Sequence, residues 1–283
     1  MTEFILNYEP TIRLSFFLGI LAAMAGWEFL APRRALILAR PARWTANLGI
    51  VFLNSVILRL IFPAGAVGVA VFAASEGWGL FNHFTVPYVV AVVLSVVALD
   101  FAIYLQHVMF HAVPALWRLH RMHHADLDFD VTTGARFHPI EIVLSVLIKF
   151  AVIVVLGAPV LAVIVFEVLL NATAMFNHSN VRLPLALDRV LRLLVVTPDM
   201  HRVHHSIHAH ETNSNFGFNL PWWDRLFGTY RDQPEEGHER MTIGIRDFRE
   251  PRVADRLPGM LAIPFRGKVT DYAINRREWG PAK

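Results

Sequence analysis

The sequence predicts an all-α integral membrane protein with about four transmembrane helices, or three plus a re-entrant hairpin, and a cytoplasmic helical cap that holds a histidine-rich metal site. Three observations predict this class. The 283 residues are 55% hydrophobic and 17% charged, with a mean hydropathy of +0.44, which is too apolar for a soluble domain of this length. Several apolar runs are long enough to cross a bilayer as helices. Histidines gather at the ends of those runs.

Composition also excludes several kinds of chemistry. The chain has no cysteine, so disulfides, thiolate nucleophiles and iron–sulfur clusters are absent, and imidazole and carboxylate remain as metal ligands. The net charge is only +3, and the arginines sit beside apolar runs rather than along one face, so nucleic acid is not an expected partner. The N-terminal M-T-E-F-I-L lacks the basic start of a signal peptide, so we expect the first apolar run to be retained.

The first half of the chain predicts two membrane segments. Ile12 to Leu30 is long enough for one span. Arg33 to Arg43 carries four arginines, which the positive-inside rule places in the cytoplasm, and the N-terminus is then outside. Leu48 to Ala74 forms the second apolar run. Within it, Arg59 lies near a kink expected at Pro63, and we interpret it as a snorkelling or bundle-facing arginine.

Two further apolar runs follow. Pro87 to Ala102 returns through the membrane, and the first histidine cluster comes directly after it. Ile140 to Leu170 is broken by Gly157-Ala158-Pro159 and is too long for one straight span, so a helical hairpin or a re-entrant pair is expected. Such a hairpin returns the chain to the side of the first cluster. Topology alone therefore predicts that the histidines meet on the cytoplasmic face of the membrane, which we expect to be a bacterial inner membrane.

The later part of the chain is more polar. In the segment Val181 to Val196, the residues Asp188, Arg189 and Arg192 fall on one side of a helix and leucines on the other, which predicts an interfacial amphipathic helix. From Asp199 onward the composition resembles that of a soluble protein. We therefore divide the chain into an N-terminal transmembrane region at 1–86, a catalytic region at 87–235 and a polar C-terminal tail at 236–283.

The histidines have the spacing of metal ligands. Residues four apart lie on one face of a helix, so H-V-M-F-H can direct two rings at one ion. The pattern H-x-x-H-H turns three rings to one side, and it occurs twice, although chance predicts roughly 0.03 occurrences in a chain of this composition. A further histidine follows an apolar run in F-N-H-S-N. The nine candidate ligands are His107, His111, His120, His123, His124, His178, His201, His204 and His205.

The remaining histidines and nearby acids have other expected roles. A lone histidine is usually a satisfied polar or capping residue, and this is our interpretation of His83, His208, His210 and His238. Packing many imidazoles together without a cation would leave ring nitrogens without partners, so we do not apply this interpretation to the histidine clusters. As hydrogen-bond partners of the ligands we expect His138, Glu141, Asp126 and Asn177. Whether His138 is itself a ligand stays open.

The ligand set indicates the metal. Structural zinc takes four ligands, and the zinc-protease motif H-E-x-x-H does not occur. Ferritin-like E-x-x-H pairs are absent near the clusters, and nine histidines are too many for one ion. A nearly all-imidazole site with open positions at a membrane face suits two irons that activate dioxygen for attack on a C–H bond.

Taken together, these motifs resemble the fatty acid hydroxylase superfamily, also called the sterol desaturase family. The resemblance rests on H-V-M-F-H, W-R-L-H-R-M-H-H, R-F-H-P-I-E, N-H-S-N, T-P-D-M-H-R-V-H-H-S and N-S-N-F-G-F-N-L-P-W-W-D-R-L-F-G-T-Y, which run in order from Asp100 to Tyr230. It implies a membrane-embedded bundle with a cytoplasmic di-iron cap, in which the nine histidines are the ligands. Some lipid hydroxylases of the superfamily have H-x-x-x-H where this chain has Ala174 and His178, so a tenth ligand is not expected.

The resemblance implies a membrane-bound oxidoreductase that uses O₂ and external electrons to hydroxylate or desaturate a lipid such as a fatty acyl chain or a sterol. The lipid, the carbon attacked and the outcome, including ether cleavage, stay open. A ferredoxin, a cytochrome b5-like protein or a reductase would deliver electrons, and Arg33 to Arg43 could dock an acidic donor. Four aromatic residues could close the cap over the site or simply pack: Trp222, Trp223, Phe227 and Tyr230.

Two other classes of protein remain as alternatives. A histidine-rich divalent-metal transporter would place its ligands in the middle of its spans, whereas here the clusters follow the inner ends of the apolar runs. A bis-histidine haem b subunit would place paired histidines inside two facing spans, and an absorption spectrum without a Soret band would exclude it.

Overall fold

The computed structural model describes residues 2–269, 272 and 274, and this part of the chain is helical with no strand, as predicted. The rest of the expected C-terminal tail lies outside the described residues. The helices are α1 Thr2–Leu30, α2 Arg40–Ile61, α3 Gly65–Ser75, α4 Leu80–His83, α5 Tyr88–Ala112, α6 Pro114–His124, η1 Thr133–Ala135, α7 Pro139–Leu156, α8 Val160–Asn177, α9 Leu185–Leu191, α10 Pro198–His204, α11 Ala209–Thr212, α12 Trp222–Phe227, α13 Pro251–Ala254, α14 Leu257–Ala262 and η2 Ile263–Phe265.

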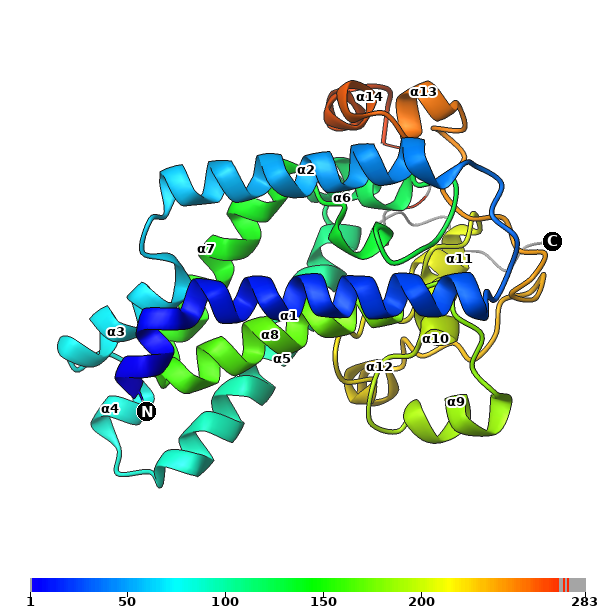
Figure 1. Cartoon of the computed structure of the whole chain (residues 1–283). Helices are drawn as coiled ribbons and strands as arrows, with labels where there is room; N and C mark the ends of the chain where they lie inside the picture. Colours follow the sequence, from blue (N-terminus) through cyan, green and yellow to red (C-terminus); the bar gives the residue numbers. More distant parts are fainter. Residues whose placement is uncertain (1, 270–271, 273, 275–283) are drawn as a thin grey trace.

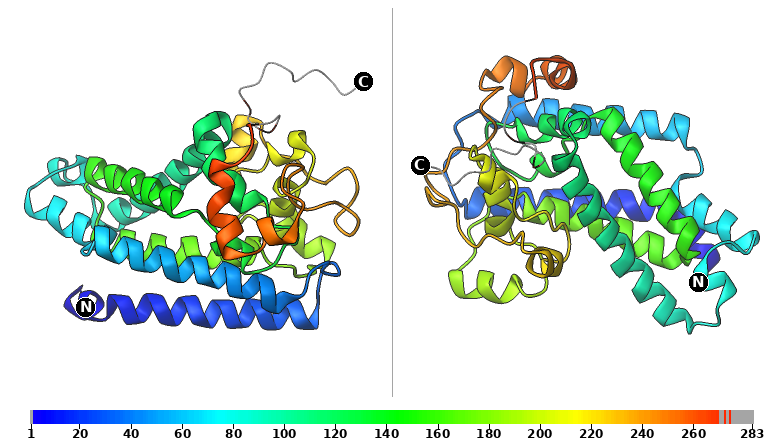
Figure 2. Two further views of the ribbon diagram at one scale, coloured as in Figure 1. Left: turned by 90° about the horizontal axis from the view of Figure 1, so that it is seen from above. Right: turned by 180° about the vertical axis from the view of Figure 1, so that it is seen from behind.

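The molecule has a bundle of long helices at one end and a cap of short helices at the other (Figures 1 and 2). The described residues contain five helices long and apolar enough to cross a membrane. Their segments are Pro10–Leu30, Arg40–His83, Tyr88–Ala112, Pro139–Leu156 and Val160–Asn177. In the bundle α1 packs on α8, α2 packs on α7, and α5 packs on both α7 and α8.

The expected hairpin forms, and it accounts for a fifth helix where about four were predicted. Its legs, α7 and α8, are 18 residues each, so both are long enough to cross. They are joined at Gly157, whose φ is 63°. A side chain there would meet the carbonyl oxygen of Trp78 at 2.7 Å, so both the backbone angle and the close approach require glycine.

The second apolar run bends where proline predicts. α2 ends at Ile61, and α3 begins at Gly65 after Pro63, because proline lacks the N–H that would continue the helix. Arg59 Nη1 donates to the Pro63 carbonyl at 3.1 Å and remains exposed, which fits the expected snorkelling arginine near a kink.

The bundle contains a buried group of ion pairs that the apolar pattern of the sequence did not predict. Glu167 of α8 is buried and forms ion pairs with Lys149 of α7 and, at 3.0 Å, with Arg13 of α1. A carboxylate within a membrane helix is costly unless it is paired. The group therefore ties α1, α7 and α8 together in the membrane.

The basic segment from Arg33 to Arg43, which leads into the first turn of α2, makes contacts inside the cap. The Arg43 side chain is 1% exposed and forms ion pairs with Asp126 at 2.9 Å and with Asp130. Arg33 pairs with Asp199 and Glu239, and Arg34 donates to the Met241 carbonyl. The idea that this segment docks an acidic electron donor is therefore wrong for these three arginines, since intramolecular partners already occupy them.

The amphipathic helix is shorter than predicted. Only Leu185–Leu191 is helical, because Val181 bridges to Pro32 at one end of the segment and the chain turns after Arg192. Asp188 and Arg192 form a buried ion pair at 2.6 Å, while Leu185, Leu187 and Val190 of the helix are exposed. An outward apolar face still suits a membrane interface.

The C-terminal region beyond 235 completes the core of the cap rather than forming only a polar tail. Its residues Ile245, Met260 and Ile263 pack with Trp117 and Met122 of α6. The helix that carries three of the candidate ligands is thereby covered from the outside.

We predict that Arg43→Ala lowers the free energy of unfolding by about 3 to 5 kcal/mol, because it leaves the buried carboxylates of Asp126 and Asp130 without their cation. Chemical unfolding of the protein in detergent measures this. Arg240→Ala is the control, since Arg240 is exposed. Equal stability of the two variants would contradict the importance of the buried ion network.

Candidate functional site

The nine predicted histidines meet in the cap, where each is at most 6% exposed. They form two adjacent groups, and in each the candidate ligand atoms all lie within 4.8 Å of one another. The first group contains His107, His111, His120, His124 and His204, and the second contains His123, His178, His201 and His205. Each H-x-x-H-H motif contributes to both groups, so the two groups share their supporting helices.

Local structure brings the histidines together. α5 ends at Ala112, and Val113 is extended (φ −95°, ψ 116°) before Pro114 starts α6. This short connection turns α6 back against α5, so the H-x-x-H-H motif faces the pair His107 and His111. Thr197 caps α10 by accepting from the Met200 N–H, which starts the helix that carries the second motif.

Six of the nine rings are oriented through Nδ1. Five of the acceptors are carbonyl groups and one is a carboxylate. The bonds run from His107 to the Phe216 carbonyl (2.8 Å), from His111 to Asn213 Oδ1 (3.1 Å), from His120 to Glu141 Oε1 (2.6 Å), from His123 to the Arg136 carbonyl (3.2 Å), from His178 to the Ala174 carbonyl (2.9 Å) and from His204 to the Ser214 carbonyl (2.7 Å). Because these oxygens accept, Nδ1 carries the proton and Nε2 presents a lone pair.

The inward nitrogens face one another at distances that call for a cation. Nε2 of His107 lies 3.1 Å from Nε2 of His120, and Nε2 of His178 lies 3.2 Å from Nε2 of His123. In each of these pairs both rings carry their proton on Nδ1, so the lone pairs of the two Nε2 atoms face each other. Nε2 of His204 has no hydrogen-bond partner within the described residues. A metal ion in each group would use these nitrogens as neutral donors, so the residues fit two metal ions.

Burial keeps the rings neutral. It lowers the pKa of His120 and of His178 to about 3. The same cause, reinforced by neighbouring imidazoles, holds the pKa of His204 and His205 well below the ordinary value. Neutral imidazole is the form that binds metals, so both groups are ready for metal at physiological pH.

The loop after α11 supplies three of the orienting acceptors: Asn213, Ser214 and Phe216. Asp224 holds this loop by accepting from the N–H groups of Phe216 and Gly217, each at 2.8 Å. Sequence reasoning assigned no role to these residues. The motif N-S-N-F-G was visible, but a backbone carbonyl has no signature in the sequence.

Of the four expected partners of the ligands, the structure places only Glu141 against a ligand ring. Asp126 is bound by Arg43 and Thr133. His138 caps α7 by accepting from the Ile140 N–H, and Asn177 donates to the Phe218 carbonyl. For these three, the hydrogen bonds found among the described residues run to the scaffold around the site. His138 is engaged in a helix cap and Asp126 in a buried ion pair, while the Asn177 amide nitrogen bonds to a backbone carbonyl.

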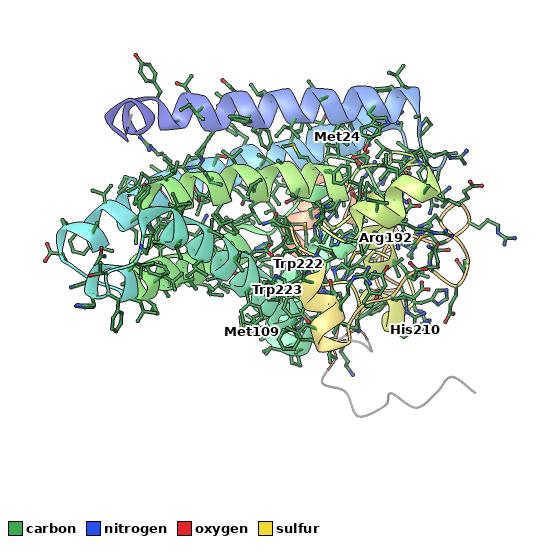
Figure 3. All side chains as sticks on the ribbon, turned by 90° about the horizontal axis from the view of Figure 1, so that it is seen from below. Met24, Met109, Arg192, His210, Trp222 and Trp223 are labelled. Atoms are coloured by element: carbon green, nitrogen blue, oxygen red, sulfur yellow. The ribbon has the colours of Figure 1, made fainter. Side chains whose placement is uncertain are left out.

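The isolated histidines stay outside both groups, as expected. His208 pairs with Glu236, and His210 pairs with Glu235. His210, Glu211 and Glu235 are close enough to hold an ion, but His210 and Glu235 already bond to each other at 2.7 Å. His210 lies on the outer part of the cap (Figure 3).

A cavity of about 300 Å³ leads from the bundle to the histidines. His107, His120 and His123 form one end, and Phe17 of α1 and Leu58 of α2 line it farther into the bundle. Most of the remaining wall comes from α5, α7 and α8, and Gly134, Ala135, Phe137 and Phe218 complete it. A lipid chain lying between the bundle helices could therefore reach the inner edge of both groups.

The four aromatic residues considered for closing the cap or simply packing lie on α12 and just after it, and two of them, Trp223 and Phe227, pack beside α5. Trp223 donates to Asp100 at 2.7 Å and packs on Phe101, and Trp222 and Phe227 are exposed. Figure 3 shows both tryptophans together at α12. Other aromatic rings do contact the ligands: Phe137 stacks on His123 with centroids 4.5 Å apart, and Trp117 and Phe216 lie against His111.

Comparison with known proteins agrees with this site. The family described as fatty acid hydroxylase matches residues 92–229, which include all nine histidines. An ornithine lipid hydroxylase of Rhizobium tropici is 32% identical over 191 residues, covering 68% of this chain and 55% of that protein. An alkylglycerol monooxygenase of Xenopus tropicalis is 30% identical over 159 residues, 55% of this chain and 34% of that protein.

A more distant relative is a Delta(7)-sterol-C5(6)-desaturase of Nicotiana tabacum, 28% identical over 163 residues, 54% of each chain. No solved structure gives a significant match. The chain thus spans about half or a third of the length of these relatives. The matched family, the relatives and the five apolar helices agree, and the chain is an integral membrane protein that belongs to the fatty acid hydroxylase superfamily.

Proposed function

We propose that the protein is a membrane-bound oxidoreductase that hydroxylates or desaturates a C–H bond of a lipid, using two non-haem irons, O₂ and electrons from an external donor. The observation that carries this proposal is the pair of buried histidine groups at the inner end of a cavity lined by membrane helices. The names of the relatives, which include lipid hydroxylases, monooxygenases and a desaturase, support the same reaction class.

The donor set favours iron. Imidazole suits iron, and five donors in one group and four in the other leave coordination positions free for another ligand. The bound irons would supply O₂ activation and C–H oxidation. The five histidines of the first group and the four of the second would be the ligands.

The protein's own residues bind the lipid, orient the histidine rings and exclude water. The acceptors on Nδ1 hold six rings in place, as is usual for histidines that bind metals. The cap buries all nine rings and so keeps bulk water away. The cavity admits a lipid from the bundle and places one of its carbons beside His107, His120 and His123.

The two alternative functions fit the geometry less well. A transporter would need ligands along its spans, whereas the groups are collected in the cap at the inner ends of α5 and α8. A haem between two axial histidines would need room for its macrocycle, but facing Nε2 atoms are only about 3 Å apart.

The surroundings of the enzyme follow from the same proposal. The histidine cap would face the cytoplasm, with the N-terminus on the other side of a bacterial inner membrane. A ferredoxin, a cytochrome b5-like protein or a reductase would then deliver electrons to the cap. Its contact surface must lie away from Arg33, Arg34 and Arg43, which have intramolecular partners.

Lipid extracts test the reaction. We expect cells that express the protein to contain a lipid with one added oxygen or two fewer hydrogens, detected by mass spectrometry. The product should be absent with His204→Ala, because that variant removes a donor from the first group. Unchanged lipids in cells where the protein is folded and loaded with iron would contradict the proposed reaction.

The ligand role of the histidines is tested separately. We predict that His204→Ala and His201→Ala each lower the iron content of the purified protein, measured by elemental analysis after anaerobic loading. His210→Ala is the matched control, because this half-exposed histidine pairs with Glu235 outside both groups. Equal iron content in all three variants would exclude the assigned ligands.

The orienting role of Asn213 gives a further prediction. Asn213→Ala removes the acceptor for the His111 Nδ1–H, so iron affinity should fall by about 10- to 100-fold. Competition with a chelator measures the affinity. Asn82→Ala, a change in the exposed helix α4 far from the cap, should leave it unaltered. An unchanged affinity in Asn213→Ala would show that His111 does not depend on this contact.

A further inference from the structure

The cavity wall carries two buried oxygen atoms that lack partners. Asn54 of α2 and Glu141 of α7 both line the cavity and are 7% and 3% exposed. In the described part of the chain, neither Asn54 Oδ1 nor Glu141 Oε2 has a hydrogen-bond partner. Leaving a buried acceptor unsatisfied is unfavourable, so such an atom needs explanation.

The orientation of the Asn54 amide follows from its other contact. Its Nδ2 donates to the Phe137 carbonyl at 2.9 Å. Because a carbonyl can only accept, the nitrogen must face it, and Oδ1 must be the atom that remains free. The free atom is therefore an acceptor.

Glu141 is oriented in the same manner. Its Oε1 accepts from the His120 Nδ1–H at 2.6 Å, and the second oxygen remains available on the cavity wall. Other polar groups nearby are already paired, as Gln106 and Ser145 bond to each other at 2.9 Å. Among the described residues that line the cavity, the buried acceptors without a hydrogen-bond partner belong to Asn54 and Glu141.

Glu141 lies next to a candidate metal ligand, and Asn54 is linked to another through Phe137. Glu141 bonds directly to His120, and the ring of Phe137, whose carbonyl holds Asn54, stacks on His123. A group on the lipid that reached them would therefore lie close to the carbon that is oxidised.

We propose that Asn54 Oδ1 and Glu141 Oε2 bind a hydrogen-bond donor on the lipid beside the reacting carbon. The preferred substrate is then a lipid with a hydroxyl or an N–H group at that point, rather than an unsubstituted hydrocarbon chain. A site built to receive a donor discriminates against an analogue that lacks it, because its buried acceptors would stay unpaired. This inference rests on the proposed function and specifies its substrate class.

Binding without turnover tests it. Iron-loaded protein in nanodiscs is kept anaerobic without reductant, and displacement of a radiolabelled probe is measured for two matched pairs of lipids. One pair is 1-O-hexadecylglycerol and its di-O-methyl ether, and the other is N-methylhexadecanamide and N,N-dimethylhexadecanamide. In at least one pair, the lipid with the donor should bind about tenfold more tightly than its methylated partner. Equal binding within both pairs overturns the proposal.

Variants locate the effect. In Asn54→Leu the ratio of the two affinities within a lipid pair should fall towards one. Iron content and thermal stability report whether the variant is folded. Asn171→Leu makes the same change elsewhere on the cavity wall, where Asn171 donates to the Glu167 carbonyl, and it should keep the parent ratio. A folded Asn54→Leu that keeps the ratio overturns the role of Asn54. A general structural defect would weaken both members of a pair and leave their ratio unchanged.

The same experiment separates the inference from the proposed function. Selective binding with no oxidation on adding O₂ and reductant would contradict the proposed function but support the donor-binding role of Asn54 and Glu141. Oxidation of lipids without selective binding in either pair would contradict only the donor-binding role of Asn54 and Glu141.

Discussion

The constraint on which this structure depends is the burial of nine neutral imidazoles with lone pairs directed at one another. The pairs His107 with His120 and His123 with His178 bring two proton-free nitrogens to about 3 Å, an arrangement that repels unless a cation lies between the donors. The rest of the cap holds the rings in this arrangement. Carbonyl and carboxylate oxygens accept hydrogen bonds from the outer nitrogens of six rings, and the packing of α6 against Met260 and Ile263 keeps the rings from turning out to solvent.

The membrane bundle and the cap are parts of one device. α5 and α8 run from the bilayer to the site, and each ends near a ligand, His111 on α5 and His178 just after α8. The cavity follows the same path in the space between the helices. The buried pairing of Arg43 with Asp126 and Asp130 then joins α2 to the loop after α6. Substrate access and ligand geometry therefore depend on the same helices.

Much of this could be predicted from the sequence because it rests on local periodicity. The spacing of His107 and His111 and the repeated H-x-x-H-H predict shared helix faces, and Gly157-Ala158-Pro159 predicts the hairpin. What could not be predicted depends on long-range pairing. The partners of Arg43 and Glu167 lie on other elements of the chain, so Arg43 looked like part of a docking segment and Glu167 like part of an apolar run. The carbonyls that orient His107 and His204 are backbone atoms, which any residue could supply.

The most direct test of the central claim is to load the purified protein with iron anaerobically and to combine elemental analysis with X-ray absorption spectroscopy at the iron edge. The account predicts two irons per chain, each with a first shell dominated by imidazole nitrogen. A single metal ion per chain, or a first shell dominated by oxygen, would contradict it.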